Sequence, residues 1–93
     1  MARKQFVSKF ADEAALIEYA TVLKFEEQNK HYGQKIKTVF YCKTPKMDKE
    51  LMCVAWGETY ISVGDVVNIK GRMKDDVFLV WGMMIIKKKE AEV

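Results

Sequence analysis

Apolar and polar residues alternate with a period of two along parts of this chain. From Lys35 to Lys43, the even-numbered positions are Ile, Thr, Phe and Cys, whereas Lys, Val and Tyr occupy the odd-numbered ones. A second alternation runs from Ile17 to Glu26. This period is typical of β-strands that bury one face. Both segments are predicted strands, although helix-forming residues between Ala11 and Ala20 also allow a helical turn there.

Three more segments are predicted strands because they are rich in apolar residues and lie between turn signals. They are Leu51–Trp56, Val66–Met73 and Val77–Ile86. The connecting residues favour loops and turns. The connections are a polar loop at Gln28–Gln34, a turn around Pro45 and Asp48, breaks at Gly57 and Gly64, and a tight turn at Lys74–Asp76. Five strands with short connections predict an all-β barrel or sandwich, and a closed barrel avoids exposed strand edges.

The chain of 93 residues has the length of one domain. We expect its core to cover about residues 15–88, between a short basic N-terminal arm and a short C-terminal tail. Apolar residues make up 49% of the sequence, which excludes a disordered chain. The net charge is only +3, but residues 28–49 hold six lysines against one aspartate. The basic surface is therefore expected in the middle of the chain.

The residues that could carry chemistry are few. Two cysteines and one histidine cannot supply the four ligands of a structural zinc site, and no phosphate-binding glycine loop is present. We therefore predict no metal, no cofactor and no enzymatic activity. Cys42 and Cys53 are expected to be buried free thiols, with a cross-strand disulfide as the alternative. Because the sequence lacks a signal-peptide pattern and a long apolar run, we expect an intracellular protein without a membrane partner.

Three motifs occur in a suggestive order. They are HYGQKIKTVFYCKT at residues 31–44, LMCVAWGE at residues 51–58 and VGDVVNIKGRM at residues 63–73. Together they resemble the OB-fold group that binds single-stranded nucleic acids, which includes bacterial single-stranded DNA-binding proteins and replication protein A. The resemblance covers about residues 15–88. It implies a single five-stranded OB-fold barrel that binds single-stranded DNA, ahead of RNA, with little sequence preference.

The sequence departs from this group in two places. OB-folds usually carry a helix between the third and fourth strands, but only Glu58 to Val63 are available for it here. The helix is therefore expected to be reduced or absent. Bacterial single-stranded DNA-binding proteins also have a long tail with an acidic end, whereas this sequence stops at Val93.

The second and third strands are expected to pair around a turn near Met47. A register that places Cys42 opposite Cys53 also places Tyr41 opposite Val54. One side of this hairpin would then be core. The core side comprises Thr38, Phe40, Cys42, Leu51, Cys53 and Ala55. The other side combines apolar and aromatic residues with lysines, and comprises Lys35, Lys37, Val39, Tyr41, Lys43, Met52, Val54 and Trp56.

The second side has the chemistry that single-stranded nucleic acid requires. Bases stack on Trp and Tyr, and phosphates bind lysine and arginine side chains. The resemblance places a stacking aromatic at Trp56, with Tyr41 as its expected neighbour. The residues expected to contact nucleic acid are Trp56, Tyr41, Lys35, Lys37, Lys43, Tyr32, Lys30 and Arg72. The alternatives are that Trp56 belongs to the core and that the lysines only solvate the strand. Trp81 is expected in the core or in an interface and not as a stacking residue.

The last predicted strand is apolar on both faces, since Met83, Met84, Ile85 and Ile86 are consecutive. One face would fill the barrel and the other needs a cover. We therefore expect an oligomer or a partner subunit that covers Trp81, Met83, Met84 and Ile86. The alternative function is an OB-fold subunit or adaptor that binds protein within a replication, telomere or RNA-processing complex.

Overall fold

The computed structural model describes residues 14–89. These residues form five β-strands and no helix. The strands are β1 (Ala15–Tyr32), β2 (Lys35–Lys43), β3 (Leu51–Trp56), β4 (Val66–Lys74) and β5 (Val77–Lys87). The predicted N-terminal arm, the part before residue 14 of the segment that also allowed a helical turn, and the end of the C-terminal tail lie outside the described residues. Within residues 14–89, no helix exists that could span a membrane.

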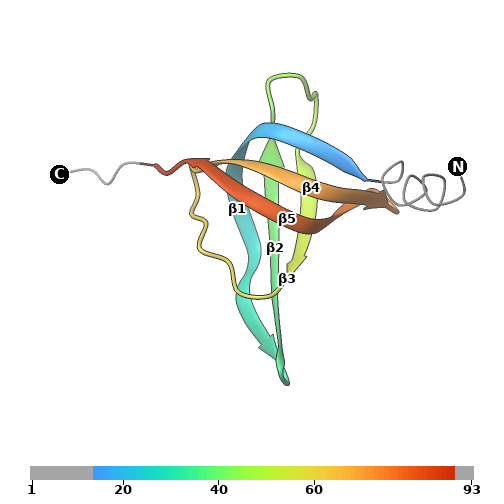
Figure 1. The fold of residues 1–93 in the computed structure, drawn as a ribbon, viewed down its shortest axis with the longest axis vertical. Coiled ribbons are helices and arrows are strands. Elements are labelled where there is room, and N and C mark those ends of the chain that lie inside the picture. Colours follow the sequence, from blue (N-terminus) through green and yellow to red (C-terminus); the bar gives the residue numbers. More distant parts are fainter. Residues whose placement is uncertain (1–13, 90–93) are drawn as a thin grey trace, which may run out of the picture.

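The five strands form one sheet that closes into a ring in the order β1-β2-β3-β5-β4, with β4 returning to β1 (Figure 1). Four of the five pairs are antiparallel, and β3 pairs with β5 in parallel. The hairpin of β1 and β2 projects from the ring at one end, and the β2–β3 connection lies at the opposite end (Figure 1). The prediction of an all-β chain with five strands is therefore confirmed.

The predicted strand bounds hold best where the alternation is clean. The bounds of β2 and β3 match the prediction, and β4 and β5 each extend one residue further. The turn predicted at Lys74–Asp76 is a two-residue hairpin connection in which Asp75 and Asp76 have φ values of 52° and 66°. Positive φ at both central residues is the geometry of a type I′ turn, which matches the twist of paired strands.

The prediction for β1 is right at its start and wrong at its end. The segment Ala15–Ala20 is strand, so the alternative of a helical turn there is wrong, but Gln28 to Tyr32 extend β1 instead of forming the predicted loop. The strand also changes the face that it buries: Tyr19 is exposed, whereas Ala20 and Val22 are fully buried. Irregularities in the register interrupt the pairing of β1 with β2 and β4. Each irregularity shifts the alternation, so a strict period of two does not describe this strand.

The pairing of β2 with β3 differs from the predicted register. Cys42 lies opposite Leu51 and Tyr41 lies opposite Met52, two residues away from the predicted partners. Because the shift is an even number of residues, the two faces of the hairpin remain as predicted. Tyr41 is, however, no longer the neighbour of Trp56.

The inner face of the ring is the hydrophobic core. Its fully or almost fully buried members come from all five strands and from the β3–β4 loop: Ala20, Val22, Phe40, Cys42, Cys53, Ile61, Val67, Ile69 and Phe78. Cys42 and Cys53 are free thiols, as predicted, and their sulfur atoms lie 3.6 Å apart. The hydrogen bond between the two thiols lowers the pKa of Cys42, and the same bond together with burial raises the pKa of Cys53.

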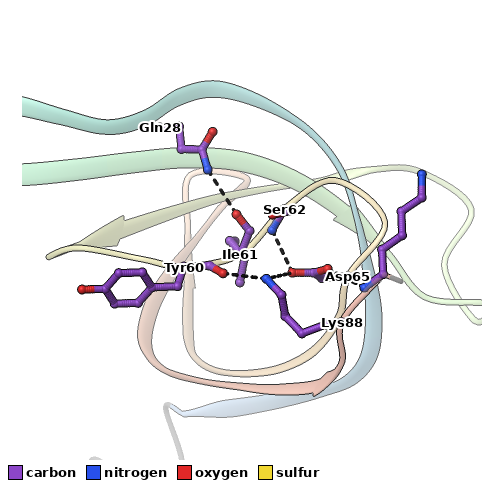
Figure 2. A network of polar contacts seen from close by, with 7 residues as sticks. Gln28, Tyr60, Ile61, Ser62, Asp65 and Lys88 are labelled. Atoms are coloured by element: carbon purple, nitrogen blue, oxygen red, sulfur yellow. Dashed lines mark hydrogen bonds and ion pairs between the residues drawn. The ribbon is translucent and has the colours of Figure 1, made fainter. Parts of the chain in front are cut away.

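The segment from Gly57 to Asp65 is a loop without a helix, in agreement with the prediction that the helix usual between the third and fourth strands of OB-folds is reduced or absent here. Ile61, at the middle of this loop, is 2% exposed and completes the core. Gln28 donates a hydrogen bond to the Ile61 carbonyl at 3.1 Å, and Lys88 donates one to the Tyr60 carbonyl at 2.9 Å (Figure 2). The loop is thus fixed by side chains from β1 and from the residues after β5.

Candidate nucleic-acid interface

Trp56 lies at the end of β3 and is 58% exposed, so its assignment to the core is wrong. It points outward because Cys53 and Ala55, which alternate with it, are buried inside the ring. Gly57 follows with a φ of 104°, which side-chain-bearing residues rarely adopt. Its N–H donates a hydrogen bond to the carbonyl oxygen of Ile36 at 2.7 Å. The chain therefore leaves the strand directly after Trp56 and leaves the indole at the surface.

Two of the lysines that are predicted to contact phosphate lie beside this indole. Lys37 is paired directly with Trp56, and its Nζ lies 5.5 Å from the ring centroid. Lys35 Nζ lies 5.8 Å from the same centroid. Both distances are within the range of cation–π attraction. Beside the ring is a pocket of about 380 Å³, lined by Gln34, Lys35, Ile36, Trp56 and Gly57.

Tyr32 and Lys30 join this group from the projecting end of β1. Lys37 Nζ lies 5.7 Å and Lys30 Nζ 5.5 Å from the Tyr32 ring centroid. The Tyr32 hydroxyl donates a hydrogen bond to Glu27 Oε2 at 2.5 Å, and this bond raises the pKa of Tyr32. The hydroxyl therefore stays protonated at neutral pH, and the bond fixes the ring beside the lysines. Five of the predicted residues thus form one cluster, which we call the Trp56 cluster: Trp56, Lys35, Lys37, Tyr32 and Lys30.

Tyr41 and Lys43 lie on the same outer face but further along β2. Tyr41 is four residues from Lys37, a separation of roughly 13 Å along a strand. Lys24 Nζ lies 4.7 Å from the Tyr41 ring centroid, and the Tyr41 hydroxyl donates a hydrogen bond to Glu26 at 3.4 Å. Lys43 is exposed and pairs with Thr21 of β1. These two residues extend the cationic and aromatic face without belonging to the Trp56 cluster.

Trp81 is 53% exposed, so its assignment to the core is also wrong. Parallel pairing places Ala55 of β3 beside Val80 of β5, and Trp56 and Trp81 are the next residues on the two strands. Phe78 and Val80 pack toward the core, so Trp81 points outward like Trp56. Both tryptophans are therefore exposed and directly follow the last paired residues of β3 and β5.

Arg72 lies on β4, on the far side of β5 from Trp56. It pairs with Leu79, which in turn pairs with Val54 of β3. Arg72 is half-buried and alternates with the buried Gly71, so it belongs to the outer face. It continues the row that runs from Val39 through Val54 and Leu79, and it is not part of the Trp56 cluster.

Sequence reasoning missed two members of this face. Lys24 was not proposed as a ligand, because the register of β1 against β2 is set by irregular pairing. Trp81 was not proposed as a stacking residue, because the parallel pairing of β3 with β5 joins segments that are distant in sequence. A pattern within one strand carries no information on such a pairing.

No family model matches this chain, and no curated protein or solved structure is significantly similar to it. Among residues 14–89, no group of three or more His, Cys, Asp or Glu side chains is placed to hold a metal ion. The geometry of the outer face is therefore the basis for a functional proposal.

Proposed function

We propose that this protein is an OB-fold protein that binds single-stranded nucleic acid, DNA ahead of RNA, along the outer face of β2, β3 and β5. The ring order β1-β2-β3-β5-β4 supports the fold assignment, since OB-folds are five-stranded Greek-key barrels. Binding rather than catalysis is proposed because the outer face combines aromatic rings with cations and holds no nucleophile paired with a base.

The observation that carries the proposal is the arrangement around Trp56. An indole that is 58% exposed lies beside two lysine ammonium groups at 5.5 and 5.8 Å from its centroid. A base that stacks on this ring would bring its phosphate close to Lys35 or Lys37. Stacking tolerates every base, because each has a flat π-face, so little sequence preference is expected.

Fluorescence anisotropy of labelled oligo-dT and oligo-U, measured over a range of salt concentrations, tests the proposal. Loss of one stacking contact costs about 1–3 kcal/mol, so Trp56→Ala should weaken binding about 5- to 150-fold. Lys37→Ala should weaken binding and reduce the salt dependence by about 0.7 in the slope of log K against log salt, as expected for one lost phosphate contact.

Two variants serve as matched controls. Tyr60→Ala removes an aromatic side chain that is 72% exposed but lies in the β3–β4 loop. Lys46→Ala removes one positive charge in the β2–β3 connection. Both should bind like the unaltered protein. Absence of binding at low salt, or equal losses in all four variants, would rule the proposal out.

The second candidate function is that of an OB-fold subunit or adaptor whose main ligand is another protein. The exposed apolar end of β5 favours it, since Met84 and Ile86 are 65% and 40% exposed. If the protein binds neither oligonucleotide but associates with another protein through β5, the result would fit this second function and not the first.

A further inference from the structure

The hairpin of β1 and β2 that projects from the ring has one residue more on β1 than on β2 (Figure 1). At its base Glu27 pairs with Val39, and at its tip Tyr32 pairs with Lys35. Between these two pairs β1 has four residues and β2 has three. The extra residue must therefore leave the ladder as a β-bulge.

The two-residue turn at the tip of the hairpin fixes the pairing there. Gly33 has a φ of 66°, whereas Gln34, the second residue of the turn, has no positive φ. A positive φ at the first central residue alone is the pattern of a type II′ turn, which favours glycine at that place. The pairing of Tyr32 with Lys35 is therefore determined locally, and the extra residue has to be accommodated closer to the ring.

The bulge lies at Gln28 and Asn29, which together occupy the place opposite Thr38. Asn29 has a φ of 50°, a conformation that asparagine adopts more readily than most residues with a side chain. Its N–H donates a hydrogen bond to Thr38 Oγ1, and its side-chain amide donates one to the Thr59 carbonyl, both at 2.9 Å. Its Oδ1 accepts a hydrogen bond from the Thr59 N–H at 2.8 Å. The bulge is thus held from β2 and from the β3–β4 loop.

The register beyond the bulge places Lys30 and Tyr32 on the face of Trp56. Opposed residues of an antiparallel pair share one face of the sheet. Trp56 pairs with Lys37, and Lys37 pairs with Lys30. Tyr32 follows two residues later, with its ring centroid 5.5 Å from Lys30 Nζ and 5.7 Å from Lys37 Nζ.

Without the bulge at this point, the same sequence would present a different side chain beside Lys37. Counted regularly from Glu27, Asn29 would lie opposite Lys37, and Lys30 would point to the other face of the hairpin. The place at which the extra residue leaves the ladder therefore decides whether the surface around Trp56 carries Lys30.

This register has a cost that the stability of the hairpin does not explain. Lys30 and Lys37 are directly opposed, and like charges in this arrangement repel each other. Glu27 Oε2 lies 3.8 Å from Lys30 Nζ and offsets only part of the repulsion. A phosphate between the two ammonium groups would remove it, and binding would release counterions. The arrangement is therefore favourable where an anion binds.

We propose that Asn29 is a positioning residue for phosphate binding, an inference that rests on the function proposed above. Asn29 holds the bulge at the point of β1 that brings Lys30 opposite Lys37, and the two ammonium groups together bind one phosphate of the single strand. Asn29 acts through the backbone of β1 and does not contact the nucleic acid.

NMR of the full chain without nucleic acid tests the positioning. The unaltered protein should show nuclear Overhauser effects (NOEs) between Lys30 and Lys37, because the two residues are directly paired. Asn29→Val should lose them, since a β-branched residue rarely adopts a positive φ and cannot form the side-chain hydrogen bonds to Thr59.

Deletion of Gln28 from the Asn29→Val variant should restore these NOEs. The shortened β1 then has as many residues as β2 between the two fixed pairs, so no bulge is needed and position 29 pairs directly with Thr38. The deletion also removes the hydrogen bond from Gln28 to the Ile61 carbonyl. If Asn29 only stabilised the fold, this second loss would make the variant worse instead of rescuing it.

Fluorescence anisotropy with labelled oligo-dT measures the consequence for binding. Asn29→Val should weaken binding roughly fivefold at about 0.1 M salt and reduce the slope of log K against log salt by about 0.7, as expected for one lost phosphate contact. Lys30→Ala should cause no further loss in Asn29→Val, because its ammonium has already left the site. Lys43→Ala, a change outside the Trp56 cluster, should add its full effect.

Asn68→Val is the matched control. Asn68 Oδ1 accepts a hydrogen bond from the N–H of Tyr19 at 2.9 Å, and Tyr19 is the other residue of β1 with a positive φ. This variant therefore loses a comparable contact far from the Trp56 cluster and should bind oligo-dT like the unaltered protein.

Circular dichroism verifies that each variant is folded. If Asn29→Val does not fold, recovery of folding on deletion of Gln28 supports the same role. Persistence of the Lys30–Lys37 NOEs in Asn29→Val would overturn the proposal, and so would additive losses of binding in Asn29→Val and Lys30→Ala. If even the unaltered protein binds no oligonucleotide, the proposed function and the phosphate contact are both excluded, while the NOEs still decide whether Asn29 positions Lys30.

Discussion

Asp65, at the end of the β3–β4 loop, is fully buried, and its carboxylate is charged. Hydrogen bonds compensate for the burial of this charge. Its Oδ1 accepts a hydrogen bond from the Lys89 N–H at 2.8 Å, and its Oδ2 accepts bonds from the Ser62 N–H at 2.8 Å and Lys88 Nζ at 2.9 Å (Figure 2). Its backbone carbonyl accepts a bond from the Val22 N–H at 2.9 Å. One side chain thus ties the β3–β4 loop to the residues after β5.

Asp65→Asn should lower the free energy of unfolding by roughly 1–3 kcal/mol, because an amide leaves buried donors without an acceptor. Urea denaturation measures this loss. Asp76→Asn is the matched control, since Asp76 is exposed in a turn and asparagine tolerates its positive φ. Equal stability of the two variants would contradict the role assigned to Asp65.

The stability contributed by Asp65 should also depend on pH. Burial by itself raises the pKa of this carboxyl. The Lys89 and Ser62 N–H groups and the Lys88 ammonium lower this pKa by more than burial raises it, so the folded pKa lies below the ordinary value. The contribution is therefore complete above the unfolded pKa of about 3.9 and is lost as the pH falls through the folded pKa. Acid titration of unfolding should show this loss in the unaltered protein and a smaller one in Asp65→Asn.

At the scale of the element, the motif VGDVVNIKGRM has structural reasons for most of its residues. Gly64 has a φ of 96° and precedes the buried Asp65. Val67 and Ile69 are fully buried core residues of β4. At Gly71, a Cβ atom would overlap the carbonyl oxygen of Leu79 on the neighbouring strand. The motif that carries much of the resemblance to OB-folds therefore describes how β4 is built and not what the surface binds.

Gly71→Ala should lower the free energy of unfolding, because the Leu79 carbonyl of β5 occupies the space that the added methyl group needs. If the two strands separate slightly to make room, the loss should be roughly 1–3 kcal/mol. Gly82→Ala adds the same group on the same strand pair, where nothing lies within 4 Å, and should be neutral. Thermal unfolding of both variants at low protein concentration measures the difference. Similar melting temperatures would show that the close approach at Gly71 can relax without cost.

The strand β1 shows where pattern reading fails. Tyr19 and Asn29 have positive φ values of 58° and 50°, which reverse the alternation at those points. Asn29 is held there by tertiary hydrogen bonds: its N–H donates to Thr38 Oγ1 at 2.9 Å, and its side-chain amide donates to the Thr59 carbonyl at 2.9 Å. Because these partners come from β2 and the β3–β4 loop, the local sequence could not indicate the interruption.

At the scale of the whole molecule, ring closure creates the proposed binding surface. The parallel pairing of β3 and β5 places Ala55 beside Val80, so Trp56 and Trp81, 25 residues apart in the sequence, both directly follow this last pair. The pairing of β2 with β3 adds Lys37, and the projecting hairpin adds Tyr32 and Lys30. The surface therefore exists only when β2, β3 and β5 are assembled.

The two tryptophans should both respond to single-stranded nucleic acid. The chain has only these two, so in Trp56→Phe the indole fluorescence comes from Trp81 alone. Oligo-dT should quench it if a base stacks on Trp81, and Trp81→Ala should weaken binding by about 5- to 150-fold. Unchanged fluorescence at saturating oligonucleotide would restrict stacking to Trp56 and the β2–β3 hairpin.

The sequence by itself determined the strand class, the bounds of β2 and β3, and the two faces of their hairpin, because alternation within a strand decides which side chains share a face. It also identified Trp56, Lys35, Lys37, Tyr32 and Lys30 as candidates. The tertiary structure decided the register that separates Tyr41 from Trp56, the interruptions of β1 and the outward position of Trp81. All of these depend on which distant strands meet, and long-range pairing leaves no periodic signal in the chain.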